Sequence, residues 1–191
     1  MTVDISPLAL PRYGEPWTVD DLKRLPPDHT MKYEIIDGSL VVSPRAGVYH
    51  NGIAAKLCRL LTRQAPEHLL TSMESGVKVR GGATYFEPDA LLVVEAAFNQ
   101  READHLHPSD VPIVIEVLSS SNRGHDLVTK RHYYAVAGIP QYWIADPDEQ
   151  TLTVLVLGDD GAYAERAVVR PGEQWKSDEP FPLVIDPAEI F

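Results

Sequence analysis

Cysteine and long apolar runs are both scarce in this chain of 191 residues. Cys58 is the only cysteine, so no disulfide can form within the chain, and we expect a reducing, cytoplasmic setting. No apolar stretch approaches the roughly 20 residues that span a bilayer. The segment Met1 to Asp20 lacks the basic start and apolar centre of a signal peptide. We therefore expect a protein that does not associate with membranes.

Basic residues are also few. The chain has 17 Lys and Arg against 28 Asp and Glu, which gives a formal net charge of −11 at pH 7. General nucleic-acid binders carry a basic surface, so this balance weighs against one. A local basic face can survive on an acidic protein. The helix predicted over residues 48–65 has such a basic face, formed by Lys56, Arg59 and Arg63, which are candidates for phosphate contact. An ordinary solvated helix face would give the same pattern.

The length and an apolar content of 44% fit one globular domain. Residues 1–17 contain several prolines and no periodicity, so we expect an N-terminal arm before a single domain over 18–191. Helical patterns cover 19–24, 48–65 and 126–137; strand patterns cover 33–37, 39–42, 76–80, 90–94, 111–118, 141–145, 151–157 and 162–170. This order indicates an α/β (α+β) fold, with a central mixed sheet flanked by helices and a C-terminal β-hairpin.

Two carboxylates stand where an apolar core should exclude them. Pro88-Asp89 opens the apolar run 90–94, and Glu116 interrupts the apolar run 111–118. A buried carboxylate is usually paired, protonated or bound to a metal. Strand ends can converge in a mixed sheet, so the two acids predict a site for Mg²⁺ or Mn²⁺. Such an ion lowers the pKa of its bound water and polarises phosphorus, which is the chemistry of phosphate-ester hydrolysis.

A lysine follows in the helical pattern over 126–137. Lys130 shares a helix face with Asp126, Tyr133 and Tyr134, so we expect it on the buried side. An ammonium there can orient a water and offset negative charge in the transition state, and Asp126 four residues earlier can hold it in place. A surface lysine and a helix N-cap would give the same pattern, and both alternatives stay open.

Two further polar residues are accessory candidates. Glu34, between two apolar neighbours, is either a third acid of the site or a residue on an exposed strand face. His50 projects onto the apolar side of its helix, where it is either a proton carrier, a phosphate contact or an inward histidine of the core. We expect Tyr134 and Trp143 to be core aromatics and Cys58 to be a buried structural thiol.

Six segments in this order resemble the Uma-two family, which is classed with restriction endonucleases: Tyr33–Gly38, His50, Pro88-Asp89, Ile115–Ser119, Asp126–Lys130 and Gly138–Ile144. The resemblance covers about residues 18–170. The family is similar to the PD-(D/E)XK nucleases, whose core is a mixed sheet flanked by helices. It implies that Asp89 and Glu116 are metal ligands and that Glu34 is an additional acid. Leu118 stands where that superfamily has its lysine, so the resemblance gives the role to Lys130.

The sequence therefore predicts an endonuclease that uses Mg²⁺ or Mn²⁺ to hydrolyse DNA. Its catalytic residues would be Asp89, Glu116 and Lys130, with Glu34, His50 and Asp126 as accessory groups. A homodimer is expected, because cutting two strands needs two sites. Two alternatives stay open. One is a nuclease-fold binding or assembly module with little or no activity, suggested by the acidic surface and by Leu118. The other is a metal-dependent phosphoesterase for a small nucleotide.

Overall fold

The computed structural model describes residues 10–100, 104–120 and 122–191, so most of the predicted N-terminal arm lies outside it. The helical elements are α1 (Val19–Leu22), α2 (Val48–Thr62), η1 (Arg80–Gly82), α3 (Glu95–Phe98), η2 (Pro108–Asp110), η3 (His125–Lys130), α4 (Arg131–Val136) and η4 (Pro187–Glu189). The strands are β1 (Met31–Ile36), β2 (Ser39–Pro44), β3 (Leu69–Ser72), β4 (Val77–Val79), β5 (Thr84–Phe86), β6 (Ala90–Val94), β7 (Ile113–Val117), β8 (Gln141–Asp146), β9 (Thr151–Leu157), β10 (Tyr163–Val169), β11 (Trp175–Ser177) and β12 (Leu183–Ile185).

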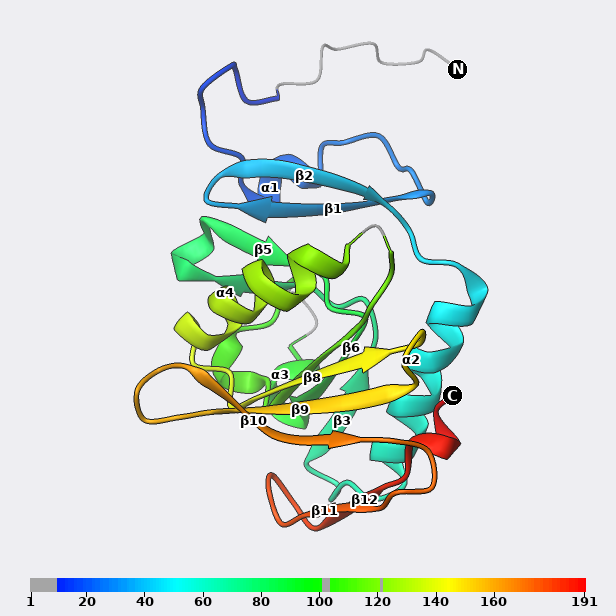
Figure 1. Cartoon of the computed structure of the whole chain (residues 1–191). Helices are drawn as coiled ribbons and strands as arrows, with labels where there is room; N and C mark the ends of the chain where they lie inside the picture. Colours follow the sequence, from blue (N-terminus) through cyan, green and yellow to red (C-terminus); the bar gives the residue numbers. More distant parts are fainter. Residues whose placement is uncertain (1–9, 101–103, 121) are drawn as a thin grey trace.

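The strands form one large sheet and two smaller ones (Figure 1). The large sheet has six strands in the order β10-β9-β8-β7-β6-β3, and a second sheet has four in the order β2-β1-β5-β4. β7 and β8 run parallel, joined by a crossover through η3 and α4, while the other neighbours in the large sheet are antiparallel. The predicted α/β fold with a mixed sheet is therefore confirmed.

Both faces of the large sheet are covered. On one face, Ile113, Ile115 and Val117 of β7 pack in the same core as the apolar side of α2. On the other face, Val114 packs in a core with Tyr134 of α4. Successive residues of a strand point to opposite faces, so Glu116 lies on the α4 side with Val114. Burial on both faces explains why β7 reads as an almost continuous apolar run.

The N-terminal hairpin follows from its turn chemistry. Asp37 and Gly38 join β1 to β2 with φ values of 46° and 76°, and two consecutive positive φ angles are typical of the type I′ turn that suits a tight hairpin. Thr18 caps α1 through a reciprocal pair of hydrogen bonds with Asp21. The end of the predicted arm is tied to this hairpin, because the Trp17 amide donates to the Gly38 carbonyl at 2.8 Å.

Several predicted elements differ from the observed ones. The helix predicted over 48–65 ends at Thr62, and the helix predicted over 126–137 is a π-helical segment, η3, followed by the short α4. The patterns missed β3, β5, β11 and β12, which are three or four residues long and too short to show an alternation. Within the described part of the chain, no helix is long and apolar enough to cross a membrane.

Candidate active site

The two predicted acids lie beside each other on neighbouring strands. β6 and β7 pair antiparallel with Ala90 opposite Ile115, which puts Asp89 in register with Glu116. Asp89 Oδ2 accepts a hydrogen bond of 2.8 Å from the Val117 amide. Both acids open on one cavity of about 180 Å³, whose lining also includes Lys32, Pro44, Arg45, Ala46, Gly47, His50, Glu74, Val117, Ser119, Asn122, Asp126 and Lys130.

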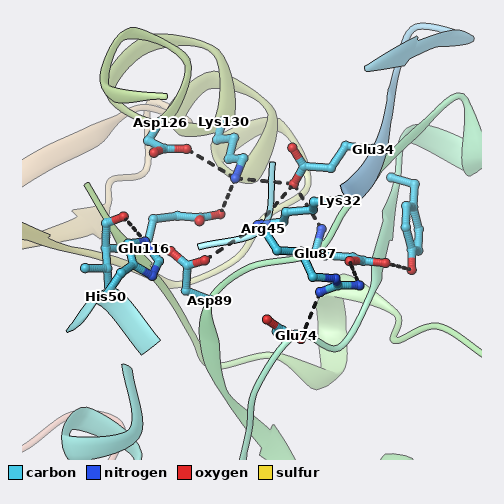
Figure 2. Close-up of polar contacts among 12 residues, drawn as sticks. Lys32, Glu34, Arg45, His50, Glu74, Glu87, Asp89, Glu116, Asp126 and Lys130 are labelled. Atoms are coloured by element: carbon cyan, nitrogen blue, oxygen red, sulfur yellow. Dashed lines mark hydrogen bonds and ion pairs between the residues drawn. The ribbon is translucent and has the colours of Figure 1, made fainter. Parts of the chain in front are cut away.

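The Lys130 ammonium lies at the centre of the acidic side chains (Figure 2). Its Nζ is 2.9 Å from Glu116 Oε1, 3.2 Å from Asp126 Oδ1 and 3.3 Å from Glu34 Oε1. Only 3% of the Lys130 side chain is exposed, so the alternative of a surface lysine is wrong. The amine of Lys130 therefore reaches Glu116 from the helix that follows β7.

Tyr134 has a polar role that the sequence did not indicate. It is a buried core aromatic, as predicted, and its hydroxyl also donates to Glu116 Oε1 at 2.8 Å. Lys130 and Tyr134 thus hold the same oxygen of Glu116 and fix the orientation of its carboxylate. An aromatic residue on an apolar helix face gives no sign of such a contact, because its partner belongs to another element.

Glu34 and Lys32 bring the second sheet to the site. Glu34 is buried, so the alternative of an exposed strand face is wrong, and its Oε1 accepts from the Glu87 amide at 3.2 Å. Lys32 Nζ lies 3.5 Å from Asp89 Oδ1 and 3.8 Å from Glu34 Oε1. The sequence analysis missed Lys32. Its position two residues before Glu34 on β1 is the signal that places both side chains on one face.

His50 approaches the acids from α2. Its Nε2 lies 2.6 Å from the Val117 carbonyl oxygen and 3.3 Å from Asp89 Oδ2. A carbonyl oxygen can only accept, so Nε2 carries the proton that it donates there. Burial disfavours the charged imidazole, but the hydrogen bond and charge of Asp89 outweigh it and raise the pKa of His50. The inward orientation predicted for His50 is confirmed.

The cluster carries more negative than positive groups. Four carboxyl groups, those of Glu34, Asp89, Glu116 and Asp126, surround the two ammonium groups of Lys32 and Lys130, which leaves an excess of two negative charges when all are ionised. Such an excess is met by protons or by a cation.

The pKa shifts follow from burial and from these charges. Burial raises the pKa of Glu116 and of Asp126, and the Lys130 ammonium opposes both shifts. Burial also opposes ionisation of Asp89, but its hydrogen bond to His50 and the charge of Lys32 hold its pKa well below the usual range. For Lys130, the charges of Glu116 and Glu34 outweigh burial and raise the pKa well above the usual range. The ammonium therefore stays charged.

These residues fit a hard divalent cation. No group of three Asp, Glu, His or Cys side chains forms a ready metal cage among the described residues. Mg²⁺ does not need one, because it commonly takes one or two carboxylates and fills its other positions with water and phosphate oxygens. Asp89, Glu116 and Val117 line the same cavity, and the excess of negative charge in the cluster favours a bound cation.

The basic residues predicted on α2 lie elsewhere. Lys56 Nζ donates to the carbonyl oxygens of Ile190 and Phe191, at 2.9 and 3.2 Å. Arg63 pairs with Glu189 at 2.6 Å. With Arg59 on the same helix, none of the three lines the cavity that holds Asp89 and Glu116. The structure therefore ties two of these basic side chains to the C-terminal segment and does not bring the group to the acids.

Comparisons with known proteins identify the fold and the family of this chain. A crystal structure described as a putative nuclease belonging to DUF820, from Anabaena variabilis, has the same fold, with a TM-score of 0.71 and 20% sequence identity over 92% of this chain and 98% of that chain. No protein of curated function matches the chain. The family model Uma2, described as "putative restriction endonuclease", matches residues 19–188. The chain therefore belongs to the Uma2 family of putative restriction endonucleases.

Proposed function

We propose that this protein is an endonuclease that uses Mg²⁺ or Mn²⁺ to hydrolyse phosphodiester bonds of DNA, with Asp89, Glu116 and Lys130 as its catalytic residues. One observation carries the proposal: a buried ammonium touches Glu116 at 2.9 Å, and Glu116 shares a cavity with Asp89 on the neighbouring strand. Membership of the family supports a nucleic acid as the substrate.

Asp89 and Glu116 would hold the cation. A bound Mg²⁺ supplies a water of lowered pKa and offsets negative charge on the phosphate. Hydrogen bonds from the Val117 amide and from Tyr134 hold the two carboxylates in one orientation each, so little reorganisation is needed when the cation arrives.

Lys130 would place a fixed positive charge beside the reacting phosphate. A preorganised ammonium in a buried site stabilises the additional negative charge that develops in the transition state. Glu34 and Asp126 keep the ammonium in position from two sides, at 3.3 and 3.2 Å. His50, which donates to the Val117 carbonyl, orients Asp89 and can carry a proton to or from the site.

Cleavage assays on supercoiled and linear DNA with Mg²⁺ or Mn²⁺ test the proposal. We expect the wild type to cleave in the presence of either ion and to stop in EDTA. Asp89→Asn and Glu116→Gln should each slow cleavage by about 100-fold or more. Asp21→Asn is the matched control, because Asp21 is also buried but caps α1. Cleavage that persists unchanged in both site variants would reject the assigned residues.

Duplex cleavage also predicts an assembly. The described residues of one chain form one cavity that holds Asp89 and Glu116. Cutting both strands of a duplex needs two such sites, so we expect a homodimer on DNA. Light scattering of the protein with and without a duplex measures this directly, and a single chain bound to a duplex that is cut in both strands would contradict it.

A further inference from the structure

Arg45 is the cavity's most exposed basic residue. It follows β2 in the link that leads to α2, and its backbone amide donates to the Thr30 carbonyl at 2.8 Å. Its side chain is 33% exposed, against 12% for Lys32, 14% for His50 and 3% for Lys130, the other basic side chains of the lining. Those three are held by the carboxylates of the site. Arg45 is therefore the cation best placed to meet a ligand at the mouth.

An exchangeable carboxylate holds Arg45 in place. Arg45 Nη1 lies 2.9 Å from Glu74 Oε2, while Arg45 Nη2 lies 3.8 Å from Glu87 Oε2 (Figure 2). The Glu74 side chain is 45% exposed, and pairs exposed to this degree contribute only about 0–1 kcal/mol. A phosphate can accept two parallel hydrogen bonds from a guanidinium and is a stronger partner than such a carboxylate.

The backbone at Glu74 is unusual. Glu74 lies in the turn between β3 and β4 with φ at +50°, a left-handed conformation that costs a non-glycine residue about 1–2 kcal/mol. A hydrogen bond of 2.6 Å between Ser72 Oγ and Ser75 Oγ closes the turn. The turn thus holds a carboxylate on the cavity lining at an energetic cost, and backbone strain of this kind often accompanies a functional position.

We propose that Arg45 binds a phosphate group of the DNA strand at the mouth of the cavity, next to the phosphate that is cleaved. Glu74 pairs with Arg45 until the bound phosphate displaces the Glu74 carboxylate. The inference rests on the proposed function, because it takes a DNA phosphodiester as the ligand. Arg45 then contributes to DNA affinity, and Glu74 acts as an internal competitor that lowers it.

Binding of a labelled DNA duplex, followed by fluorescence anisotropy with Ca²⁺ in place of Mg²⁺, tests this without cleavage. Arg45→Gln should weaken binding roughly tenfold and reduce the slope of log K against log salt by about 1. Arg45→Lys keeps the charge but not the paired hydrogen bonds. Its affinity for DNA should lie between that of the wild type and that of Arg45→Gln. Glu74→Gln should tighten binding roughly threefold, and this gain should disappear when Arg45→Gln is also present.

The matched controls are Arg166→Gln and Glu165→Gln on β10, an edge strand of the large sheet. They make the same charge changes and should alter affinity by less than about twofold. Arg45→Gln that behaves like Arg166→Gln, or a Glu74→Gln gain that survives without Arg45, overturns the inference. The inference is also overturned if an RNA duplex binds as tightly as the DNA duplex, or more tightly, in an Arg45-dependent way, because DNA would then not be the preferred ligand. Arg45-dependent binding by a protein that never cleaves rejects the proposed function and leaves the phosphate contact standing.

Discussion

Glu116 is a buried carboxylate in which burial and charge conflict. Its pKa is raised mainly by burial, so the ionised form costs stability in the cation-free protein. The stability linked to protonated Glu116 is fully present below the ordinary pKa of a glutamate, about 4.3, and is lost as the pH rises through the raised value. Asp89 works in the opposite direction. Its lowered pKa adds stability above about pH 4, which is lost as the pH falls.

This conflict predicts the effect of Glu116→Gln. The amide keeps an acceptor for Lys130 and Tyr134 but removes one of the excess negative charges. In EDTA near pH 8 we expect the variant to be more stable than the wild type by about 1 kcal/mol, with a smaller difference near pH 5, where Glu116 holds its proton. It should also lose the stabilisation that Mn²⁺ gives the wild type. Calorimetric melts at both pH values measure this, and a lower melting temperature with an intact Mn²⁺ response would contradict it.

Lys130→Met should have the opposite effect. It removes the ammonium that faces Glu34, Glu116 and Asp126 and leaves their carboxylates buried with less compensation. We expect a loss of about 3–5 kcal/mol in the free energy of unfolding at neutral pH. The loss should shrink as the pH falls, because the carboxylates take up protons. Urea unfolding at several pH values measures these free energies of unfolding.

Lys176→Met serves as the control for this variant, because Lys176 is exposed on β11 and should cost less than about 0.5 kcal/mol. A Lys130→Met protein as stable as this control at neutral pH would show that the carboxylates do not need the ammonium.

Single residues were predictable where one charge interrupts an apolar pattern. Asp89, Glu116 and Lys130 stand out for this reason, and the structure brings them to one cluster. Lys32 and Arg45 were missed, because each reaches the cavity from the N-terminal hairpin. Asp89, which pairs with Lys32, and Glu74, which pairs with Arg45, each lie more than 25 residues away along the chain. No local pattern records such contacts.

Among the elements, η3 decides how Lys130 meets the acids. A π-helical turn contains one residue more than an α-helical turn, and such insertions are often found at functional sites. Asp126 and Lys130 are both buried in η3, while Val128 between them is 69% exposed. Both charged side chains remain buried across this wider turn, and α4 continues with Tyr133 and Tyr134 on the core side.

Deleting Val128 should therefore disrupt the site but not the fold. The shorter segment would close as an α-helix. Asp126 would then stand three residues before Lys130 instead of four, and its carboxylate would shift relative to the ammonium. We expect circular dichroism close to that of the wild type, with cleavage reduced by about 100-fold. Val128→Ala is the control, since it shortens the side chain and keeps the number of residues in η3. Full activity in the deletion variant would show that the π-helical geometry is not required.

The accuracy of the sequence analysis differs between elements for physical reasons. The β1–β2 hairpin was predictable, because Asp37-Gly38 favours the turn that the strands need. The start of α2 was also predictable from its periodic apolar face. The π-helical form of η3 was not, because a helical wheel assumes a constant turn per residue. The contacts of Lys130 with Glu116 and Glu34 form only when this segment meets the two sheets, and a helical wheel does not include them.

At the scale of the molecule, the site lies where two sheets meet. The large sheet supplies Asp89 and Glu116, the hairpin of the second sheet supplies Lys32 and Glu34, and the crossover between β7 and β8 supplies Lys130 (Figure 2). The sequence predicted the mixed sheet but not this second sheet, whose strands β4 and β5 are only three residues long.

Crystals soaked in Mn²⁺ test the central claim most directly, because anomalous scattering locates the ion without reference to activity. The account predicts one ion bound by the carboxylates of Asp89 and Glu116, absent from crystals of Asp89→Asn and Glu116→Gln. A cavity that stays empty at saturating Mn²⁺, or an ion bound only elsewhere on the chain, would contradict it.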